Sequence, residues 1–412
     1  MWLATRDRDI LAGAQGVGAQ LAMQLLIGVG EALGAERLID ISWAHVAGAF
    51  DNGQANHDFA ERLAAGGARV SVPTTLTACS TDTRMSTDAS ALALVELYKG
   101  MGCEAELTCA PYYSREEPGF GEHLAWCESS AVVYANSVLG ARTNRYVEFL
   151  DMCAAITGRV PETGLHIVEN RKAAVLCRLI DLPPEWLAAD WFFQVLGIYL
   201  GRRLGDAIPA IEGLPASTSR ERLRALGSAL ATTGSVNMFH AIGLTPEAAT
   251  RDAAFQSDAP GPEIEICAGD VRETAAGLTR NNGEPLQAVC LGAPHFSLDE
   301  FAELDRLLDG RRVASGIRMV VATSRAVLAE LEQAGSLDGL RRAGVGIVID
   351  RCTYYKPAVE GCRGHVMTSS AKWAYYAPAA LGVPVTFADL QVCIDSACSG
   401  RLVSGTEPWA RR

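Results

Sequence analysis

Several widespread site signatures are missing from this chain of 412 residues. It has no C-x-x-C pair, which argues against a zinc ribbon or a thioredoxin-type site. It has neither a G-x-G-x-x-G pattern nor a G-K-[ST] loop, so nothing in it supports nucleotide binding. No internal repeat and no low-complexity tract stand out. Any metal site must therefore gather its ligands from distant parts of the chain.

Basic charge is scarce, because 36 Lys and Arg stand against 48 Asp and Glu, for a formal net charge of −12. A nucleic-acid or anionic-membrane partner calls for a basic surface, so we expect neither. The first residues, MWLATRDRDILAG, lack the apolar core of a secretory signal. The apolar stretch 13–33 carries glutamines at helical spacing, which predicts an amphipathic helix rather than a membrane span. We therefore expect a cytoplasmic protein.

The chain contains 12 cysteines, and without an export signal we expect no disulfide framework. Most of them are expected to act as small buried hydrophobes. Three stand at the ends of predicted strands, namely Cys109, Cys290 and Cys352. Thiolates bind soft metals such as iron, and an iron–sulfur cluster needs about three or four of them. Each of the three cysteines is thus either a metal ligand or a buried structural residue.

The domain organisation follows from the hydrophobic pattern. The length suffices for two or three domains with cores of their own. After about Pro262, apolar runs alternate with segments of helical period, which predicts parallel strands joined by right-handed crossovers. We predict an N-terminal α/β region over residues 1–261, a C-terminal α/β domain over 262–400 and a loose tail over 401–412. The expected strands of the C-terminal domain are 288–291, 317–322, 345–349 and 384–387, and its helices are 298–308, 324–334, 370–381 and 388–399.

Strands are harder to place before residue 262. We expect them at 68–72, 105–108 and 162–170, and we expect a helix at 88–101. In open α/β sheets ligands collect at the carboxyl ends of strands. His45 stands just beyond a probable buried strand, which makes it either a site residue or a satisfied core histidine.

The stretch 123–145, HLAWCESSAVVYANSVLGARTNR, is the centre of the chain. Only Glu128 carries a formal charge between residues 124 and 139, so we expect a buried helix there, ended by Gly140. Two arginines follow at once, Arg142 and Arg145. Their guanidinium groups can bind a carboxylate or can complement the negative C-terminal end of the helix.

A second helix start, Thr368-Ser369-Ser370-Ala371-Lys372, combines hydroxyl groups with a lysine. Ser370 is a reasonable N-cap. Such a helix start either binds an anion or is an ordinary capped helix with a solvated lysine.

Taken together, these residues resemble the large subunit of the aconitase X family, a branch of the aconitase superfamily of hydro-lyases. The resemblance runs nearly end to end. The matching residues are Glu128-Ser129-Ser130-Ala131, Asn136-Ser137-Val138-Leu139-Gly140-Ala141-Arg142-Thr143-Asn144-Arg145, Pro73-Thr74-Thr75-Leu76, Thr108-Cys109, Pro111-Tyr112, Pro294-His295, Ser297-Leu298, Lys372, Tyr375-Tyr376-Ala377-Pro378 and Leu381-Gly382-Val383.

The resemblance implies an α/β protein of the aconitase type, with parallel-sheet domains around a central cleft. It also implies a dehydratase that uses iron or an iron–sulfur cluster as Lewis acid. Two substrates are associated with the family: cis-3-hydroxy-L-proline, which gives Δ1-pyrroline-2-carboxylate, and mevalonate 5-phosphate. Binding of a phosphorylated substrate requires extra basic residues, so the acidic net charge favours cis-3-hydroxy-L-proline.

The implied site combines residues from the whole chain. The catalytic candidates are Lys372, Ser370 and His45, and the metal candidates are Cys109 and Cys352, with Cys290 the weaker third. The substrate-binding candidates are Ser129, Ser130, Thr143, Asn144, Arg145 and Thr75, with the substrate carboxylate expected near Asn144 and Arg145.

The chain departs from the family in two ways. Ala293 stands where the family often has a cysteine ligand, which leaves a non-catalytic iron-binding or scaffolding relative as an alternative. The superfamily's small domain, expected to supply a catalytic serine base, has no room after Gly400. We therefore expect a separate small subunit as partner. The competing hypothesis is a homo-oligomer whose own base is Ser370 or His45.

Overall fold

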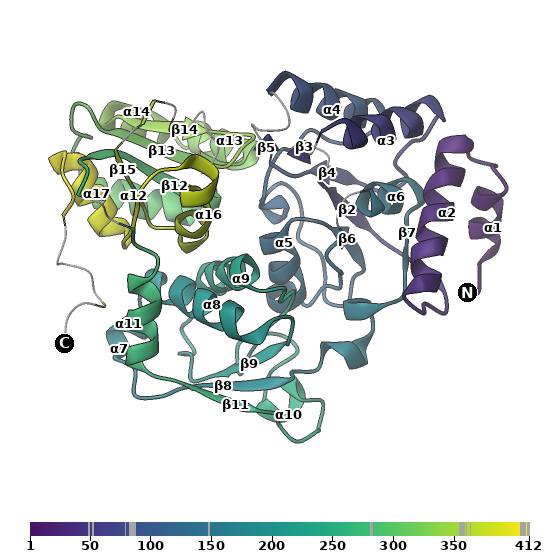
Figure 1. Cartoon of the computed structure of the whole chain (residues 1–412), viewed down its shortest axis with the longest axis horizontal. Coiled ribbons are helices and arrows are strands. Elements are labelled where there is room, and N and C mark those ends of the chain that lie inside the picture. Colours follow the sequence, from purple (N-terminus) through teal and green to yellow (C-terminus); the bar gives the residue numbers. More distant parts are fainter. Residues whose placement is uncertain are drawn as a thin grey trace. The chain divides into compact units, whose positions relative to one another are not determined.

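The computed structural model describes the chain except for residues 48, 49, 52, 79, 82–87, 147, 148, 281, 282, 354–358, 360, 363, 404–408 and 410–412. Residue contacts divide the chain into two compact units, Met1–Lys172 and Ala173–Arg412. In Figure 1 the first unit runs from purple to blue and the second from teal to yellow.

The boundary between the units lies earlier than the expected one near residue 261. The reason is the pairing of β8 (Val175–Leu179) with β11 (Glu263–Ile266), which are parallel neighbours in one sheet. A boundary at residue 261 would separate these two strands. The regular pattern after Pro262 thus begins inside the second unit.

The first unit is built on a parallel sheet of order β4-β2-β6. Its strands are β2 (Trp43–Val46), β4 (Thr74–Leu76) and β6 (Leu124–Trp126), and every residue in them is buried. The polar side chains in these strands therefore need hydrogen-bond partners inside the core. Two smaller sheets pair β1 (Leu38–Asp40) with β7 (Arg159–Pro161) and β3 (Phe50–Asp51) with β5 (Ser80–Thr81).

Helices surround this sheet, and α6 packs against β2 as well as against α2. As predicted, α2 is amphipathic: Met23 and Leu26 are fully buried, whereas Gln24 is exposed. No helix among the described residues is long and apolar enough to cross a membrane. The helices of the unit are α1 (Thr5–Leu11), α2 (Val17–Ala32), α3 (Gln54–Ala65), α4 (Asp88–Gly100), α5 (Ser129–Tyr134), α6 (Leu150–Thr157), η1 (Pro111–Tyr113), η2 (Ala135–Leu139), η3 (Gly164–His166) and η4 (Val168–Arg171).

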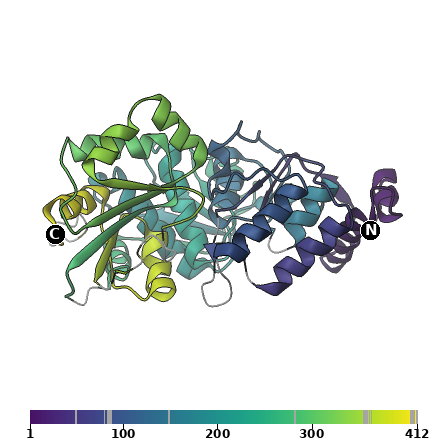
Figure 2. The same cartoon turned by 90° about the horizontal axis from the view of Figure 1, so that it is seen from above.

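The second unit holds two parallel sheets, of order β14-β13-β12-β15-β16 and β10-β9-β8-β11. In Figure 2 the strands of the larger sheet are coloured from green to yellow along the sequence. Helices α16 and α17 pack on β12 and β15. The remaining strands are β9 (Pro209–Glu212), β10 (His240–Ala241), β12 (Leu286–Phe296), β13 (Arg318–Thr323), β14 (Val345–Val348), β15 (His365–Thr368) and β16 (Val385–Phe387). The helices are α7 (Pro184–Leu187), α8 (Asp190–Leu204), α9 (Arg220–Thr233), α10 (Arg251–Ala254), α11 (Ala268–Ala276), α12 (Leu298–Leu308), α13 (Arg325–Gln333), α14 (Leu337–Ala343), α16 (Ala371–Leu381) and α17 (Leu390–Ser399).

The alternation predicted after residue 262 is confirmed, because each expected strand and helix has its counterpart from β12 to α17. Three strands predicted in the first unit are wrong. Residues 68–72 and 105–108 make only scattered backbone bonds, such as Val70 N–H to the Met101 carbonyl and Thr108 N–H to the Leu76 carbonyl. Residues 162–170 form the short turns η3 and η4, because Gly164 adopts a φ of +56° that interrupts an extended strand.

The tail predicted to be loose is anchored at Trp409, which is buried. Its ring packs on Trp191 and stacks on Phe387, with centroid distances of 4.8 and 5.5 Å. The Trp409 carbonyl accepts a hydrogen bond from Arg272 Nε at 3.2 Å. This indole thus covers an aromatic patch of the second unit.

Candidate functional site

The stretch 124–139 is not the single helix predicted for it. It consists of strand β6, helix α5 and the π-helical turn η2, which ends at Gly140 with a φ of 71°. The predicted left-handed conformation of that glycine is therefore confirmed. π-Helical turns interrupt regular helices and occur often at functional sites.

Asn136 and Arg171 hold the loop that follows η2, and both side chains are fully buried. Asn136 Oδ1 accepts from Thr143 N–H at 3.0 Å, and its Nδ2 donates to the Thr143 carbonyl at 2.9 Å. The Arg171 guanidinium donates to four oxygens, namely Asn136 Oδ1 at 3.2 Å and the carbonyls of Asn136, Ala141 and Leu165 at 2.9, 3.1 and 2.9 Å. Arg171 thus ties Asn136 of η2 to Ala141 after it, and Asn136 in turn holds Thr143.

This loop uses two of the predicted substrate-binding residues for its own structure. The Thr143 hydroxyl accepts from Trp126 N–H at 3.1 Å and donates to the Asn144 carbonyl at 2.7 Å. Asn144 donates to the Thr163 carbonyl at 3.0 Å and accepts from Leu165 N–H at 2.8 Å. Arg145, by contrast, is exposed. Of the three, it is the side chain that the surface offers to a ligand.

His45 and Thr75 are neighbours on β2 and β4, and both are buried. The Thr75 hydroxyl accepts from Trp43 Nε1–H at 3.1 Å and lies 2.8 Å from His45 Nδ1. Burial lowers the pKa of His45 to about 4, although the Glu128 carboxylate and the Thr108 carbonyl act in the opposite direction. The imidazole is therefore neutral at physiological pH.

Ser129 and Ser130 begin α5, directly after Glu128. Both hydroxyl groups donate to Glu128 Oε1, at 3.4 and 3.3 Å, and both side chains are buried. The carboxylate of Glu128 is only partly buried. These three residues place one negative charge and two hydroxyl groups at a helix N-terminus.

A partly buried network with two histidines supports the same region of the first unit. His166 Nε2 lies 2.7 Å from the Tyr146 hydroxyl, and its Nδ1 lies 3.0 Å from His123 Nδ1. Burial, followed by the charges of His123 and two nearby arginines, lowers the pKa of His166 to about 3. Burial and the charge of Arg142 also lower the pKa of His123. Both rings are thus held in the neutral form.

In the second unit, Ser370 caps α16 as predicted. Its Oγ accepts from Trp373 N–H at 3.1 Å and donates to the Ala293 carbonyl. Lys372 follows in the first turn of the helix and is 5% exposed. Ser370, Lys372 and the Gly292-Ala293-Pro294 segment line a small cavity of about 30 Å³. A cavity of this size holds about one or two water molecules.

His295 and Cys352 form a compact pair of possible metal ligands in the second unit. Both are buried, and one ring nitrogen of His295 lies within 4.8 Å of Cys352 Sγ. His295 Nε2 lies 3.2 Å from the Arg351 carbonyl, which fixes the ring. Gly292 makes this strand end possible, because a Cβ atom there would lie 2.2 Å from the Ala322 carbonyl oxygen.

The two other predicted metal ligands are Cys290 and Cys109. Cys290 is fully buried within β12, and burial raises the pKa of its thiol. The structure groups Cys352 with His295 rather than with Cys290. Cys109 belongs to the first unit, where it is 2% exposed and directly precedes Ala110 and η1. The eleven cysteines within the described part of the chain form no disulfide.

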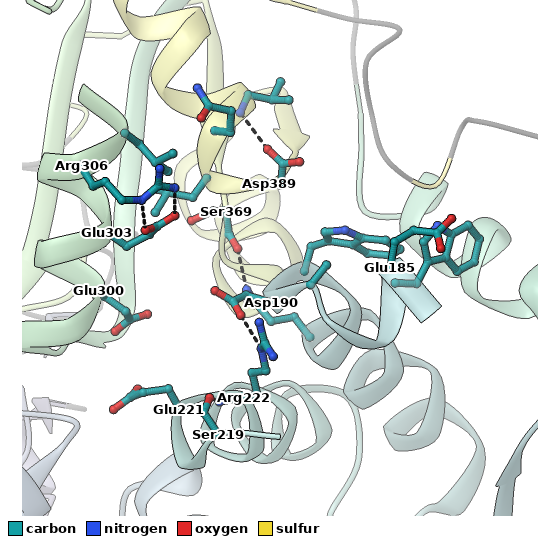
Figure 3. Close-up of a pocket in the computed structure, with 18 of the residues that line it drawn as sticks. Glu185, Asp190, Ser219, Glu221, Arg222, Glu300, Glu303, Arg306, Ser369 and Asp389 are labelled. Atoms are coloured by element: carbon teal, nitrogen blue, oxygen red, sulfur yellow. Dashed lines mark hydrogen bonds and ion pairs between the residues drawn. The ribbon is translucent and has the colours of Figure 1, made fainter. Parts of the chain in front are cut away.

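A large cleft of about 1190 Å³ also lies within the second unit (Figure 3). Its walls carry more acidic than basic side chains, and several of the acidic ones stand at helix N-termini. Asp389 caps α17 by accepting from Val392 N–H at 2.8 Å, and Glu300 completes the capping box of α12 with Ser297. Asp190 begins α8 and pairs with Arg222 at 2.7 Å. Carboxylates at these positions stabilise helices, so capping accounts for much of the negative charge of the cleft.

Known proteins match this architecture over the whole chain. The first, second and third domains of aconitase X match residues 1–169, 174–276 and 286–399. The fold agrees, because the crystal structure of holo-form aconitase X from Thermococcus kodakaraensis superposes with a TM-score of 0.86 at 33% identity, covering 96% of this chain and 100% of that one. The chain belongs to the aconitase X family, and the predicted α/β fold of the aconitase type is confirmed.

Characterised relatives are dehydratases, in agreement with the predicted hydro-lyase activity. Cis-3-hydroxy-L-proline dehydratase from Pseudomonas aeruginosa is 41% identical over 98% of this chain and 71% of its own length. The enzyme of the same name from Hypocrea jecorina is 39% identical over 97% of this chain and 69% of its own length. The phosphomevalonate dehydratase large subunit of Thermococcus kodakarensis is 36% identical, with coverages of 91% and 95%.

Sequence reasoning missed two residues that matter for this site. Arg171 gave no signal, because it directly follows the stretch 162–170, which was predicted to be a strand. His295 was noted only as part of the Pro294-His295 motif and as a possible helix cap. Its place at the end of a buried strand, like that of the cysteines, was the signal that could have singled it out.

Proposed function

We propose that this protein dehydrates cis-3-hydroxy-L-proline to Δ1-pyrroline-2-carboxylate, as the large subunit of a two-subunit enzyme. The observation that carries the proposal is the 41% identity to the P. aeruginosa dehydratase over 98% of the chain. Mevalonate 5-phosphate dehydration is the second candidate, since the relatives of that name reach 36% identity. The net charge of −12 disfavours the phosphorylated substrate.

For the substrate carboxylate we propose Arg145 as the principal partner. Its exposed guanidinium offers the planar fork of donors that a carboxylate prefers. Ser129 and Ser130 supply hydroxyl groups at the start of α5, and Glu128 adds a charge that suits the ammonium group of a proline derivative. We assign Thr143, Asn144 and Thr75 a supporting role, because hydrogen bonds within the first unit occupy their polar groups.

For the metal we propose His295 and Cys352 as ligands in the second unit. A thiolate and an imidazole suit iron, and the Arg351 carbonyl orients the ring in the way second-shell groups orient metal-binding histidines. Cys109 remains a predicted ligand from the first unit. Iron would act as a Lewis acid for the departing hydroxyl group. The nearby position 293 is Ala, so the cysteine that the family often has there is not among the proposed ligands.

The proton next to the substrate carboxylate needs a base, and the candidates within this chain are poorly suited to that task. Ser370 Oγ already caps α16 and donates to the Ala293 carbonyl. His45 has a pKa near 4, so its neutral ring is a weak acceptor of protons. We therefore propose that the base is a serine of the small subunit, in keeping with the relatives that are named large subunits. Lys372 would then balance the charge that grows on the substrate.

The test is turnover of both substrates by purified protein, with and without the family's small subunit and after iron loading. Dehydration of the hydroxyproline only with the small subunit supports the whole proposal. Full activity of this polypeptide alone, at a native mass that excludes a second chain, contradicts the two-subunit part. No turnover of either substrate by the iron-loaded complex favours the non-catalytic iron-binding alternative. We also propose that the protein is cytoplasmic.

A further inference from the structure

Helices α8 and α9 form a tightly packed pair beneath the start of α16. Their backbones touch at two glycines of α8. A Cβ atom on Gly197 would lie 2.4 Å from the Leu226 carbonyl oxygen, and one on Gly201 would lie 2.6 Å from that of Leu230. Such contacts leave no room for one helix to slide past the other. The pair is therefore a rigid support for whatever its side chains hold.

The Gln194 side chain of α8 reaches across to α16 and binds the backbone on both sides of Ser370. Its Nε2 donates to the Ser369 carbonyl at 2.8 Å, and its Oε1 accepts from Ala371 N–H at 2.8 Å. Figure 3 labels Ser369, the acceptor of the first bond. An amide satisfies both groups at once because it carries a donor and an acceptor.

This amide completes the cap of α16. The first four N–H groups of a helix have no partner within the helix. Ser370 Oγ accepts from Trp373 N–H, and Gln194 accepts from Ala371 N–H. Lys372 lies between Ala371 and Trp373, so hydrogen bonds hold the backbone on both sides of it. Gln194 also lines the cavity of about 30 Å³ together with Ser370 and Lys372.

The same helix pair holds a second part of the proposed site. Arg224 of α9 donates to the His295 carbonyl at 3.3 Å and pairs with Glu300 at 2.5 Å. The Tyr376 hydroxyl of α16 donates to the Thr232 carbonyl of α9 at 3.2 Å. One rigid element thus contacts both the Lys372 helix and the His295 strand end.

We propose that Gln194 is a positioning residue of this enzyme, which sets the place of Lys372 and Ser370 by clamping the backbone at Ser369 and Ala371. The clamp itself does not depend on the proposed function, but its expected effect on kcat rests on that function. Loss of the clamp should lower kcat more than it changes KM, since Gln194 makes no contact assigned to the substrate. A displacement of about 1 Å at such a site can cost about a hundredfold in rate.

Two variants test the clamp in the iron-loaded complex with the small subunit. Gln194→Leu removes both hydrogen bonds and keeps a side chain of similar size. We expect kcat to fall about ten- to a hundredfold. Gln194→Glu keeps the acceptor for Ala371 N–H, but its ionised carboxylate faces the Ser369 carbonyl without a donor. Protonation restores the donor, so the ratio of variant to wild-type kcat should rise as the pH falls. Gln333→Leu, at an exposed position of α13, is the matched control and should retain wild-type kcat.

Hydrogen exchange of the peptide that spans residues 369–374 provides a readout independent of turnover. We expect faster exchange in Gln194→Leu than in wild type, and no change in Gln333→Leu. Unchanged exchange, a wild-type kcat in Gln194→Leu, or a Gln194→Glu ratio that stays constant with pH would overturn the proposal. If the wild-type enzyme turns over neither substrate, the proposed function is wrong. The clamp is then tested by the hydrogen exchange of residues 369–374 alone.

Discussion

Replacing Arg171 by Met should destabilise the first unit and disorder the loop before Arg145. The guanidinium is fully buried and donates to four oxygens, three of which belong to Asn136 and Ala141. The fourth is the Leu165 carbonyl. Methionine fills much of the same space but offers no donor, so these acceptors lose a strong, charged partner.

The size of the effect follows from the cost of unsatisfied buried acceptors. Each costs about 1–3 kcal/mol, although water and local relaxation recover part of the loss. Removing one partner of a buried charged network typically costs about 3–5 kcal/mol, and we expect the free energy of unfolding to fall by about 4 kcal/mol. Since whole domains are stable by only about 5–15 kcal/mol, this is a large share.

The assay is urea unfolding followed by tryptophan fluorescence, in which buried Trp43 and Trp126 report on the first unit. Arg171→Lys should recover only part of the stability, because one ammonium group cannot reach all four oxygens. Arg62→Met, at an exposed site of α3, is the control and should change stability by less than about 0.5 kcal/mol. A wild-type unfolding midpoint for Arg171→Met, or full recovery in Arg171→Lys, would refute the reasoning.

Three further predictions concern the site. Arg145→Lys keeps the charge but loses the fork, so KM for the hydroxyproline should rise in steady-state assays. Cys352→Ser should lower the iron content of the purified protein, measured by metal analysis, and abolish its visible absorbance. Acidification should destabilise the fold, because the folded pKa of His45, about 4, lies below its usual 6.5. The contribution of neutral His45 to the free energy of unfolding is complete above pH 6.5 and is lost progressively toward pH 4. In unfolding titrations the free energy of unfolding should fall by about 3 kcal/mol over this range.

Each of these predictions has its own control. An unchanged KM and kcat in Arg145→Lys would return that residue to a structural role at the helix end. Cys267→Ser alters an exposed cysteine at the N-cap of α11, where serine is well tolerated, and should keep the iron. If Cys352→Ser keeps iron and rate as well, the metal assignment is wrong. For His45→Asn, the free energy of unfolding should fall less between pH 6.5 and 4 than it does for wild type. An equal fall in both proteins would contradict the lowered pKa of His45.

The fold of the second unit could be predicted because its pattern is local. Strands such as β13 are continuous apolar runs, and α12 has a serine cap with a glutamate three residues later. The first unit was harder to predict, because its strands are short and contain polar residues. Thr74, Thr75 and His45 are buried, so the hydrophobic pattern does not mark these strands.

The candidate site was only partly predictable, for a similar reason. The motif around Asn136 and Arg145 marked a candidate segment whose role stays a prediction, whereas the predicted cap at Ser370 is confirmed. Whether a side chain faces a ligand or its own backbone depends on contacts across the fold, as with Asn144, whose amide binds residues 163 and 165. The pairing of His295 with Cys352 joins residues far apart in the chain, which no local pattern contains.

The central claim is tested most directly by proton NMR of cis-3-hydroxy-L-proline incubated with the iron-loaded enzyme and its small subunit. The account predicts loss of the Cα and hydroxyl-bearing Cβ proton signals as the ring imine Δ1-pyrroline-2-carboxylate forms, with much slower conversion of mevalonate 5-phosphate. Unchanged hydroxyproline in a sample of verified iron content that readily dehydrates mevalonate 5-phosphate would contradict it.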